Sequence, residues 1–152
     1  MIDTSINSVR DISSRIRPAL LDKLSLSAAV EWAVEEFRKH DTVQCSLIIE
    51  PDEIEGNNAI TTFLFRLVQE ALTNISRHAC ATEANVCLKT ETGTLRLLIE
   101  DNGKGITEDK IADPDSYGIT GMREHCLSFG GEFRIGRKKD GGTRIEVIIP
   151  AS

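Results

Sequence analysis

Two oxygen-bearing side chains lie one helical turn apart in the segment "EALTNISRH", residues 70–78. Glu70 and Asn74 are separated by four residues, so on a helix they share one flank, and Arg77 follows them there. Mg²⁺ usually takes one or two protein oxygens and leaves its other positions to water and phosphates. The pair therefore favours a hydrated Mg²⁺ site, although an ordinary solvated helix flank fits the same two residues.

A second candidate lies in "IEDNGKGI", residues 99–106, where an acid and two glycines end an alternating apolar run. Asp101 can only accept hydrogen bonds, and Gly103 and Gly105 allow close backbone approach. A buried carboxylate would select a base with an exocyclic amine, such as adenine. The keto group of guanine would leave an unpaired acceptor, at a cost of about 1–3 kcal/mol. A hairpin turn, for which Asn-Gly suffices, is the alternative.

The spacing in this loop excludes two common motifs. In an EF-hand counted from Asp101, the third and fifth positions would be Gly103 and Gly105, and the sixth would be Ile106 rather than glycine. A Walker loop is excluded because no Gly-Lys-Ser/Thr follows a spaced glycine.

Two further glycine motifs follow. In "YGITGM", Gly118 and Gly121 flank an expected helix start, where free N–H groups and the helix dipole suit an anion. A tight helix entry explains the same pattern, and an RNA-binding G-x-x-G would need basic surroundings that are missing. In "GGTRIEVIIP", Thr143 opens the last strand and is otherwise an ordinary β-branched strand residue.

The hydrophobic periodicity predicts the elements that position these residues. Hairpin-connected strands exclude a simple alternating βαβ fold. We expect an α+β fold, a two-layer α/β sandwich in which a mixed or antiparallel sheet carries helices on one face. The predicted helices span about 1–17, 25–40, 59–78 and 118–131, and the predicted strands 43–49, 84–90, 95–100, 132–139 and 143–150. The buried face of the third helix is predicted to comprise Ile60, Leu64, Leu67, Val68, Ala71, Leu72 and Ile75.

Composition bounds the class of protein. The chain has 152 residues, 40% apolar and 28% charged, which suits one soluble domain. No run approaches the roughly 20 apolar residues of a membrane span, and no signal peptide is visible. A net charge of −6 argues against nucleic-acid binding. The four cysteines lack metal-ligand spacing, so we expect free structural thiols in a reducing cytoplasm, with Cys45 and Cys87 buried in strands.

The order of the four motifs resembles the ATP-binding domain shared by gyrase-type ATPases and sensor histidine kinases, which has the Bergerat-type fold. The resemblance covers about residues 57–150. Within it, "FRLVQEALTNISRHA" resembles the N box, "DNGKG" the first glycine box, "YGITGMRE" the second and "GGTRIEVIIP" the terminal element.

Upstream, "IRPALLDKLSLSAAVEW" resembles the segment that leaves the dimerisation hairpin in nitrate-sensor-type bacterial histidine kinases. Ser25 and Ala29-Val30 replace a commoner Gly and Ala-Leu there. Residues 1–24 are accordingly expected to be the end of the dimerisation helix with its linker, and residues 25–152 the catalytic domain.

The resemblance implies ATP and Mg²⁺ as cofactors and gives each motif a role. Asn74 and Glu70 would hold Mg²⁺, and Glu70 would also be catalytic, as a base or as the polariser of the attacking imidazole. Asp101 would hold the adenine amine. A lid would span residues 107–117. The other residues implied at the nucleotide are Arg77, His78, Gly103, Lys104, Gly105, Ile106, Tyr117, Gly118, Ile119, Thr120, Gly121, Met122 and Thr143.

The implied activity is that of an ATP-dependent protein-histidine kinase in a two-component system. The phosphoacceptor is expected outside this chain, because His40, His78 and His125 all lack the family's acceptor context. Expected partners are the parent's own dimerisation domain and a response regulator, without nucleic acid or direct membrane contact. We expect a homodimeric, cytoplasmic or membrane-anchored parent, of which this part alone can be monomeric. The alternatives are an anti-sigma-factor-type serine kinase and a non-catalytic nucleotide-binding module.

Overall fold

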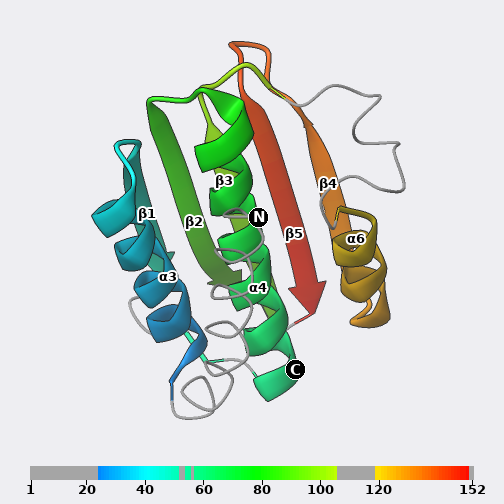
Figure 1. Ribbon diagram of the computed structural model, residues 1–152. Helices are drawn as coiled ribbons and strands as arrows, with labels where there is room; N and C mark the ends of the chain where they lie inside the picture. The colour runs from blue at the N-terminus through cyan, green and yellow to red at the C-terminus, as the bar shows by residue number, and fades with distance from the viewer. Residues whose placement is uncertain (1–23, 52–53, 56, 106–118, 151–152) are drawn as a thin grey trace, which may run out of the picture.

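The computed structural model describes residues 24–51, 54–55, 57–105 and 119–150 (Figure 1). The predicted N-terminal helix and its dimerisation role lie outside these residues. The same holds for the predicted lid, for Ile106, Tyr117 and Gly118, and for the side chains of His78, Ile119 and Thr120.

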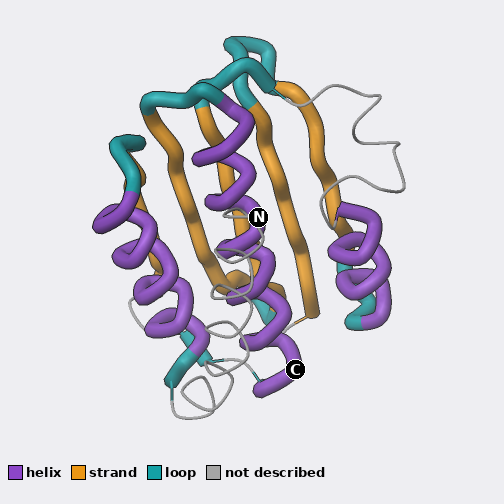
Figure 2. The backbone as a smooth tube through the Cα atoms, viewed as in Figure 1, coloured by secondary structure: helices purple, strands orange, loops and turns teal. Residues whose placement is uncertain are grey.

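The described residues form two layers, a five-stranded sheet with helices on one face, which confirms the predicted α+β sandwich (Figure 2). The strands begin and end within about two residues of their predicted limits. In chain order the elements are α3 (Leu26–His40), β1 (Gln44–Glu50), α4 (Asn58–Asn74), η1 (Ile75–Ala79), β2 (Glu83–Glu91), β3 (Thr94–Asp101), α6 (Ile119–Ser128), β4 (Glu132–Arg137) and β5 (Thr143–Pro150).

The sheet is mixed, with the strand order β1-β2-β3-β5-β4. β1 and β2 are parallel because α4 carries the chain back across the sheet between them. The other neighbouring pairs are antiparallel. As a result, the end of β3, the start of β5 and the C-terminal end of α4 all lie at one edge of the sheet (Figure 1).

Side-chain caps fix the starts of the two long helices. Ser25 Oγ accepts a hydrogen bond from the Ala28 amide at 3.2 Å, which identifies Ser25 rather than Ser27 as the cap of α3. Asn57 Oδ1 accepts from the Ile60 amide at 2.8 Å and caps α4. Such caps satisfy amide groups that have no partner inside the helix.

Helix α4 is the centre of the core. All seven residues of its predicted apolar face are buried. Phe63 and Phe65 are buried as well, because neighbouring helices cover both flanks. The Phe65 ring lies 5.9 Å from that of Trp32 on α3, and the Phe63 ring lies 5.0 Å from that of His125 on α6.

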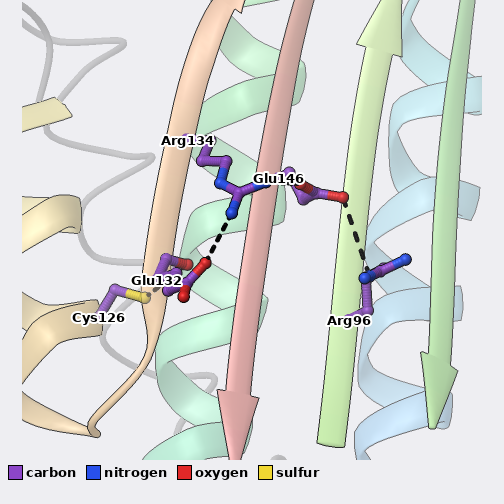
Figure 3. Close-up of polar contacts among 5 residues, drawn as sticks. All are labelled: Arg96, Cys126, Glu132, Arg134 and Glu146. Carbon is purple, nitrogen blue, oxygen red and sulfur yellow. Dashed lines mark hydrogen bonds and ion pairs between the residues drawn. The ribbon is translucent and has the colours of Figure 1, made fainter. Parts of the chain in front are cut away.

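The face of the sheet that the helices cover is apolar, whereas its other face carries acidic and basic side chains that pair with one another. On that outer face, Glu146 of β5 pairs with Arg96 at 3.8 Å and with Arg134 at 3.5 Å. Arg134 also pairs with Glu132 at 2.9 Å (Figure 3). On the inner side, the Cys126 thiol of α6 donates to the Glu132 carbonyl at 3.3 Å and joins the helix to β4.

The burial of the two strand cysteines, Cys45 and Cys87, follows from this alternation of inward- and outward-facing side chains. All four are free. Cys45 is buried as predicted, but the expectation of a buried Cys87 was wrong. Cys87 lies between Val86 and Leu88, which face the helices, so its own side chain falls on the outer face and is half-buried.

Candidate functional site

The carboxylate of Asp101 is buried at the end of β3, with 4% of the residue exposed. It continues the inward-facing series of Leu97 and Ile99, which places it beneath the helical layer. One carboxylate oxygen, Oδ1, accepts a hydrogen bond from the Gly103 amide at 2.8 Å. The predicted acceptor-only group at the end of a buried strand is therefore present.

The turn before β5 packs directly against this strand end. Gly142 has φ +97°, and a β-carbon there would lie 1.8 Å from the Asp101 carbonyl oxygen. Gly105 has φ +82°, and a β-carbon on it would meet the Gly142 carbonyl at 3.0 Å. The register that pairs Glu100 with Arg144 brings Thr143 opposite Asp101 at the next step. Two motifs forty residues apart in the chain thus form one corner.

Asn102 fastens the same corner to β2, a role that our reading of the sequence missed. Its Oδ1 accepts from the amides of Thr82 and Glu83, each at 2.9 Å. Its Nδ2 donates to Thr82 Oγ1 at 2.9 Å. The only available signal was that Asn favours turns in which its side chain bonds to nearby backbone, and this does not predict a bond across strands.

The predicted cation-binding flank of α4 is partly covered. Glu70 and Asn74 are half-buried and Arg77 is exposed. Burial raises the pKa of the Glu70 carboxyl, and the nearby Arg77 guanidinium offsets part of that rise. This places Glu70 and Arg77 near one another, as their helical spacing predicted.

A cavity of about 540 Å³ lies between α4 and α6. Three predicted site residues line it, namely Glu70, Gly121 and Met122. On its α6 side the His125 ring stacks on Phe129, with centroids 5.4 Å apart. The sequence could not have indicated this pairing of α4 with α6. The other lining residues are Asn58, Ala59, Thr62, Phe63, Arg66, Leu67 and His125.

The structure thus divides the predicted residues between two places. Asp101, Gly103, Gly105 and Thr143 form the corner at the sheet edge, whereas Glu70, Gly121 and Met122 line the cavity. The C-terminal end of α4, which carries Asn74, approaches the same sheet edge (Figure 1). Lys104 is exposed beside the corner. The arrangement offers a buried acceptor at one end and carboxylate and amide oxygens along one helix.

Residues 59–152 match the family described as histidine kinase-, DNA gyrase B- and HSP90-like ATPases. The chain belongs to this ATPase family. The ligand of its domain is therefore ATP, and the recognition of an ATP-binding domain from the four motifs is confirmed.

Curated relatives agree with this membership. The chain is 33% identical over 144 residues to the sensor histidine kinase LiaS of Bacillus subtilis, a match that covers 95% of this chain and 39% of LiaS. It is 35% identical over 150 residues to the sensor protein VraS of Staphylococcus epidermidis, covering 99% of this chain and 42% of VraS. The chain therefore spans about two fifths of the length of these relatives.

Solved structures of histidine kinases share the fold. The ATP-binding domain of PrrB from Mycobacterium tuberculosis superposes with a TM-score of 0.66 at 20% identity, covering 85% of this chain and 96% of that domain. A blue-light-activated histidine kinase from Erythrobacter litoralis gives a TM-score of 0.72 at 20% identity, covering 93% of this chain and 54% of that protein. At such identity these likenesses establish the fold alone.

Among the residues that the structure describes, no group of three or more His, Cys, Asp and Glu side chains is placed to hold a metal ion. None of the described helices is both long and apolar enough to span a membrane.

Proposed function

We propose that this chain is the catalytic part of a two-component sensor histidine kinase. It binds Mg-ATP and transfers the γ-phosphoryl group to a histidine outside the chain, from which a response regulator receives it. Residues 1–24 would belong to the dimerisation region and residues 25–152 to the catalytic domain. The observation that carries the proposal is the buried Asp101 carboxylate, held against the glycine turn that opens β5.

Asp101 supplies base selectivity in this proposal. Its carboxylate accepts hydrogen bonds and cannot donate, so it pairs with the exocyclic amine of adenine, directly and through water shared with Thr143. Gly142 leaves no side chain in the corner, where a β-carbon would collide with the Asp101 carbonyl. A guanine keto group would face an unpaired acceptor, which is costly in a buried site.

In this proposal the phosphates of ATP lie along the flank of α4 that carries Glu70 and Asn74. The donor set there fits Mg²⁺, since Asn74 and Glu70 offer a carboxamide and a carboxylate oxygen and a nucleotide supplies the rest. The bound ion would neutralise phosphate charge. Arg77 and His78 would add positive charge, and residues 118–122 would cover the triphosphate, with backbone N–H groups at the start of α6 facing it.

Glu70 is the proposed catalytic residue. Its carboxylate would accept a hydrogen bond from one N–H of the incoming imidazole, which orients the other ring nitrogen for attack on the γ-phosphorus. The imidazole proton then moves toward Glu70 as the phosphorus–nitrogen bond forms and ADP leaves.

The setting of the whole protein is also proposed. The parent would be a homodimer of the nitrate-sensor-type subfamily, located in the cytoplasm or anchored to a membrane, with its dimerisation domain supplying the phosphoacceptor. None of His40, His78 and His125 would serve as acceptor, because none of them stands in a phosphoacceptor motif. Incubation of this chain with ATP should therefore leave no acid-labile, alkali-stable phosphate on it.

Isothermal titration calorimetry tests the nucleotide site directly. With Mg²⁺ present, a non-hydrolysable ATP analogue should bind, and the matching GTP analogue should bind at least about tenfold more weakly, as the loss of a buried hydrogen bond predicts. No heat with either nucleotide would support a non-enzymatic module whose pocket has lost nucleotide binding. Equal affinity for both nucleotides would remove Asp101 as the selective group. Phosphorylation of a serine on an antagonist protein would instead favour the serine-kinase alternative.

A further inference from the structure

We infer that Asn102 is a positioning residue that couples the base-binding end of β3 to the phosphate-binding end of α4. The inference rests on the proposed function and adds a residue that does not touch the nucleotide. Asn102 follows Asp101 directly, yet its side chain turns away from the corner and bonds to the start of β2.

The geometry fixes the orientation of the Asn102 amide. Two backbone N–H groups, those of Thr82 and Glu83, converge on Oδ1 at 2.9 Å, and only an acceptor fits there. Nδ2 then faces Thr82 Oγ1 at 2.9 Å. The backbone N–H of Asn102 also donates a hydrogen bond to the Glu83 carbonyl at 3.2 Å. We call these four bonds the Asn102 clamp.

The clamp is more than a local turn, because the residues that Asn102 binds follow directly on the end of the α4 helix. α4 continues into η1, which ends at Ala79, and β2 begins at Glu83. Only residues 80–82 separate them, and Cys80 is held at φ 53°, a left-handed conformation that limits how this connector can rearrange. A shift of Thr82 would therefore move the end of the helix that carries Asn74 and Arg77.

A third element is tied to the same point. The Thr82 carbonyl accepts from the Gln44 amide of β1 at 2.9 Å. With β1 holding one side of Thr82 and Asn102 the other, the connector has a fixed position relative to β3. The separation between the Asp101 carboxylate and the α4 flank then depends on Asn102, and a nucleotide must reach both groups at once.

The test compares the wild-type chain with Asn102→Ala and Asn102→Asp. Alanine removes the three side-chain bonds of the clamp. Aspartate keeps the acceptor for both amides, and the Thr82 hydroxyl can donate to its second oxygen, so Asn102→Asp should restore the clamp. Asn85→Ala is the matched control. Asn85 is an exposed asparagine like Asn102, but it lies within β2, away from the corner, and bonds to Ser46 on the neighbouring strand β1.

The readout is the affinity for a non-hydrolysable ATP analogue, measured by calorimetry with Mg²⁺ and again with EDTA. We expect the gain in affinity that Mg²⁺ provides to shrink about two- to tenfold in Asn102→Ala, the effect of misplacing one hydrogen-bonded group. It should be unchanged in Asn102→Asp and Asn85→Ala. Melting temperatures report stability separately, since a purely structural residue would lower the melting temperature without altering this gain.

Three results would overturn the inference. The first is an unchanged Mg²⁺-dependent gain in Asn102→Ala, at any melting temperature. The second is equal loss in the alanine and aspartate variants, which would show that the clamp bonds are not the cause. The third is a wild-type chain that binds no ATP analogue, which would overturn the proposed function itself and remove the basis of the inference with it.

If Asn102→Ala does not fold, Thr82→Val takes its place, because it removes only the bond from Nδ2. The affinity gained from Mg²⁺ must then shrink by less than the amount expected for Asn102→Ala, and an unchanged gain in Thr82→Val overturns the inference.

Discussion

Asp101 ends β3 and Gly142 lies in the turn just before the neighbouring strand β5, and their backbones meet with no room for a side chain. A β-carbon on Gly142 would lie 1.8 Å from the Asp101 carbonyl oxygen and 3.0 Å from the α-carbon of Asn102. Backbone atoms cannot move aside as a flexible side chain can. The conformation of this glycine and the position of the buried carboxylate are therefore linked.

Substituting Gly142 with alanine should disrupt both folding and nucleotide binding. The variant meets the backbone clash and the strain of φ +97°, so we expect a loss of about 3 kcal/mol or more in the free energy of unfolding. Gly93→Ala is the matched control. Gly93 also has positive φ, at +76°, but nothing lies within 4 Å of the added carbon, so only the strain of about 1–2 kcal/mol applies. Urea unfolding of both variants measures the difference, and equal losses would show that the close approach is unimportant.

Replacing Asp101 with asparagine should separate binding from folding. Asn Oδ1 can keep the bond from the Gly103 amide, so the melting temperature should change little. The new NH₂ group would face the adenine amine, donor against donor, and affinity for ATP should fall at least about tenfold. Calorimetry with the ATP analogue checks this. Asp140→Asn, on the exposed turn before β5, removes the same charge and should bind like the wild type.

Local patterns predicted most of the fold. The buried face of α4 was predicted correctly because its apolar residues recur with the 3.6-residue period of a helix. The hairpins were read correctly because their turns are short and contain glycine. Cys87 was misjudged because its apolar character outweighed the two-residue period that places it on the outer face.

Long-range contacts within the site were much harder to predict. The clamp joins Asn102 to Thr82, and the cavity brings His125 on α6 next to Phe63 on α4. Neither pair has a sequence period that relates its members, because each contact depends on how whole elements pack. By contrast, Asp101 and Thr143 were linked only through family resemblance, which carries long-range information that residue spacing lacks.

The Glu70 carboxyl should make stability depend on pH in a defined direction. Because burial raises its pKa in the folded state, the folded chain holds this proton more tightly than the unfolded chain. The stabilisation is complete below the unfolded pKa, about 4.3 for glutamate, and is lost as pH rises through the raised folded value. Glu70→Gln should therefore gain stability relative to the wild type as pH increases from about 4 toward neutral.

Urea unfolding of the wild type and Glu70→Gln at a series of pH values measures this effect. Glu124→Gln, on the exposed side of α6, removes the same charge from solvent and serves as the control. The assigned direction would be contradicted if the stability of Glu70→Gln relative to the wild type stayed constant or fell as pH rises.

Gly121 offers a test of whether the start of α6 meets the phosphates. A β-carbon there would have nothing within 4 Å, and the residue lies in a helix, where alanine is favoured over glycine by about 0.8–1 kcal/mol. Gly121→Ala should therefore fold at least as stably as the wild type. If the triphosphate approaches this backbone from the cavity side, the added methyl group should nevertheless weaken binding of the ATP analogue severalfold while leaving adenosine binding unchanged. A variant that is more stable and binds both ligands normally would place the phosphates away from α6, and melting curves with paired titrations distinguish the two outcomes.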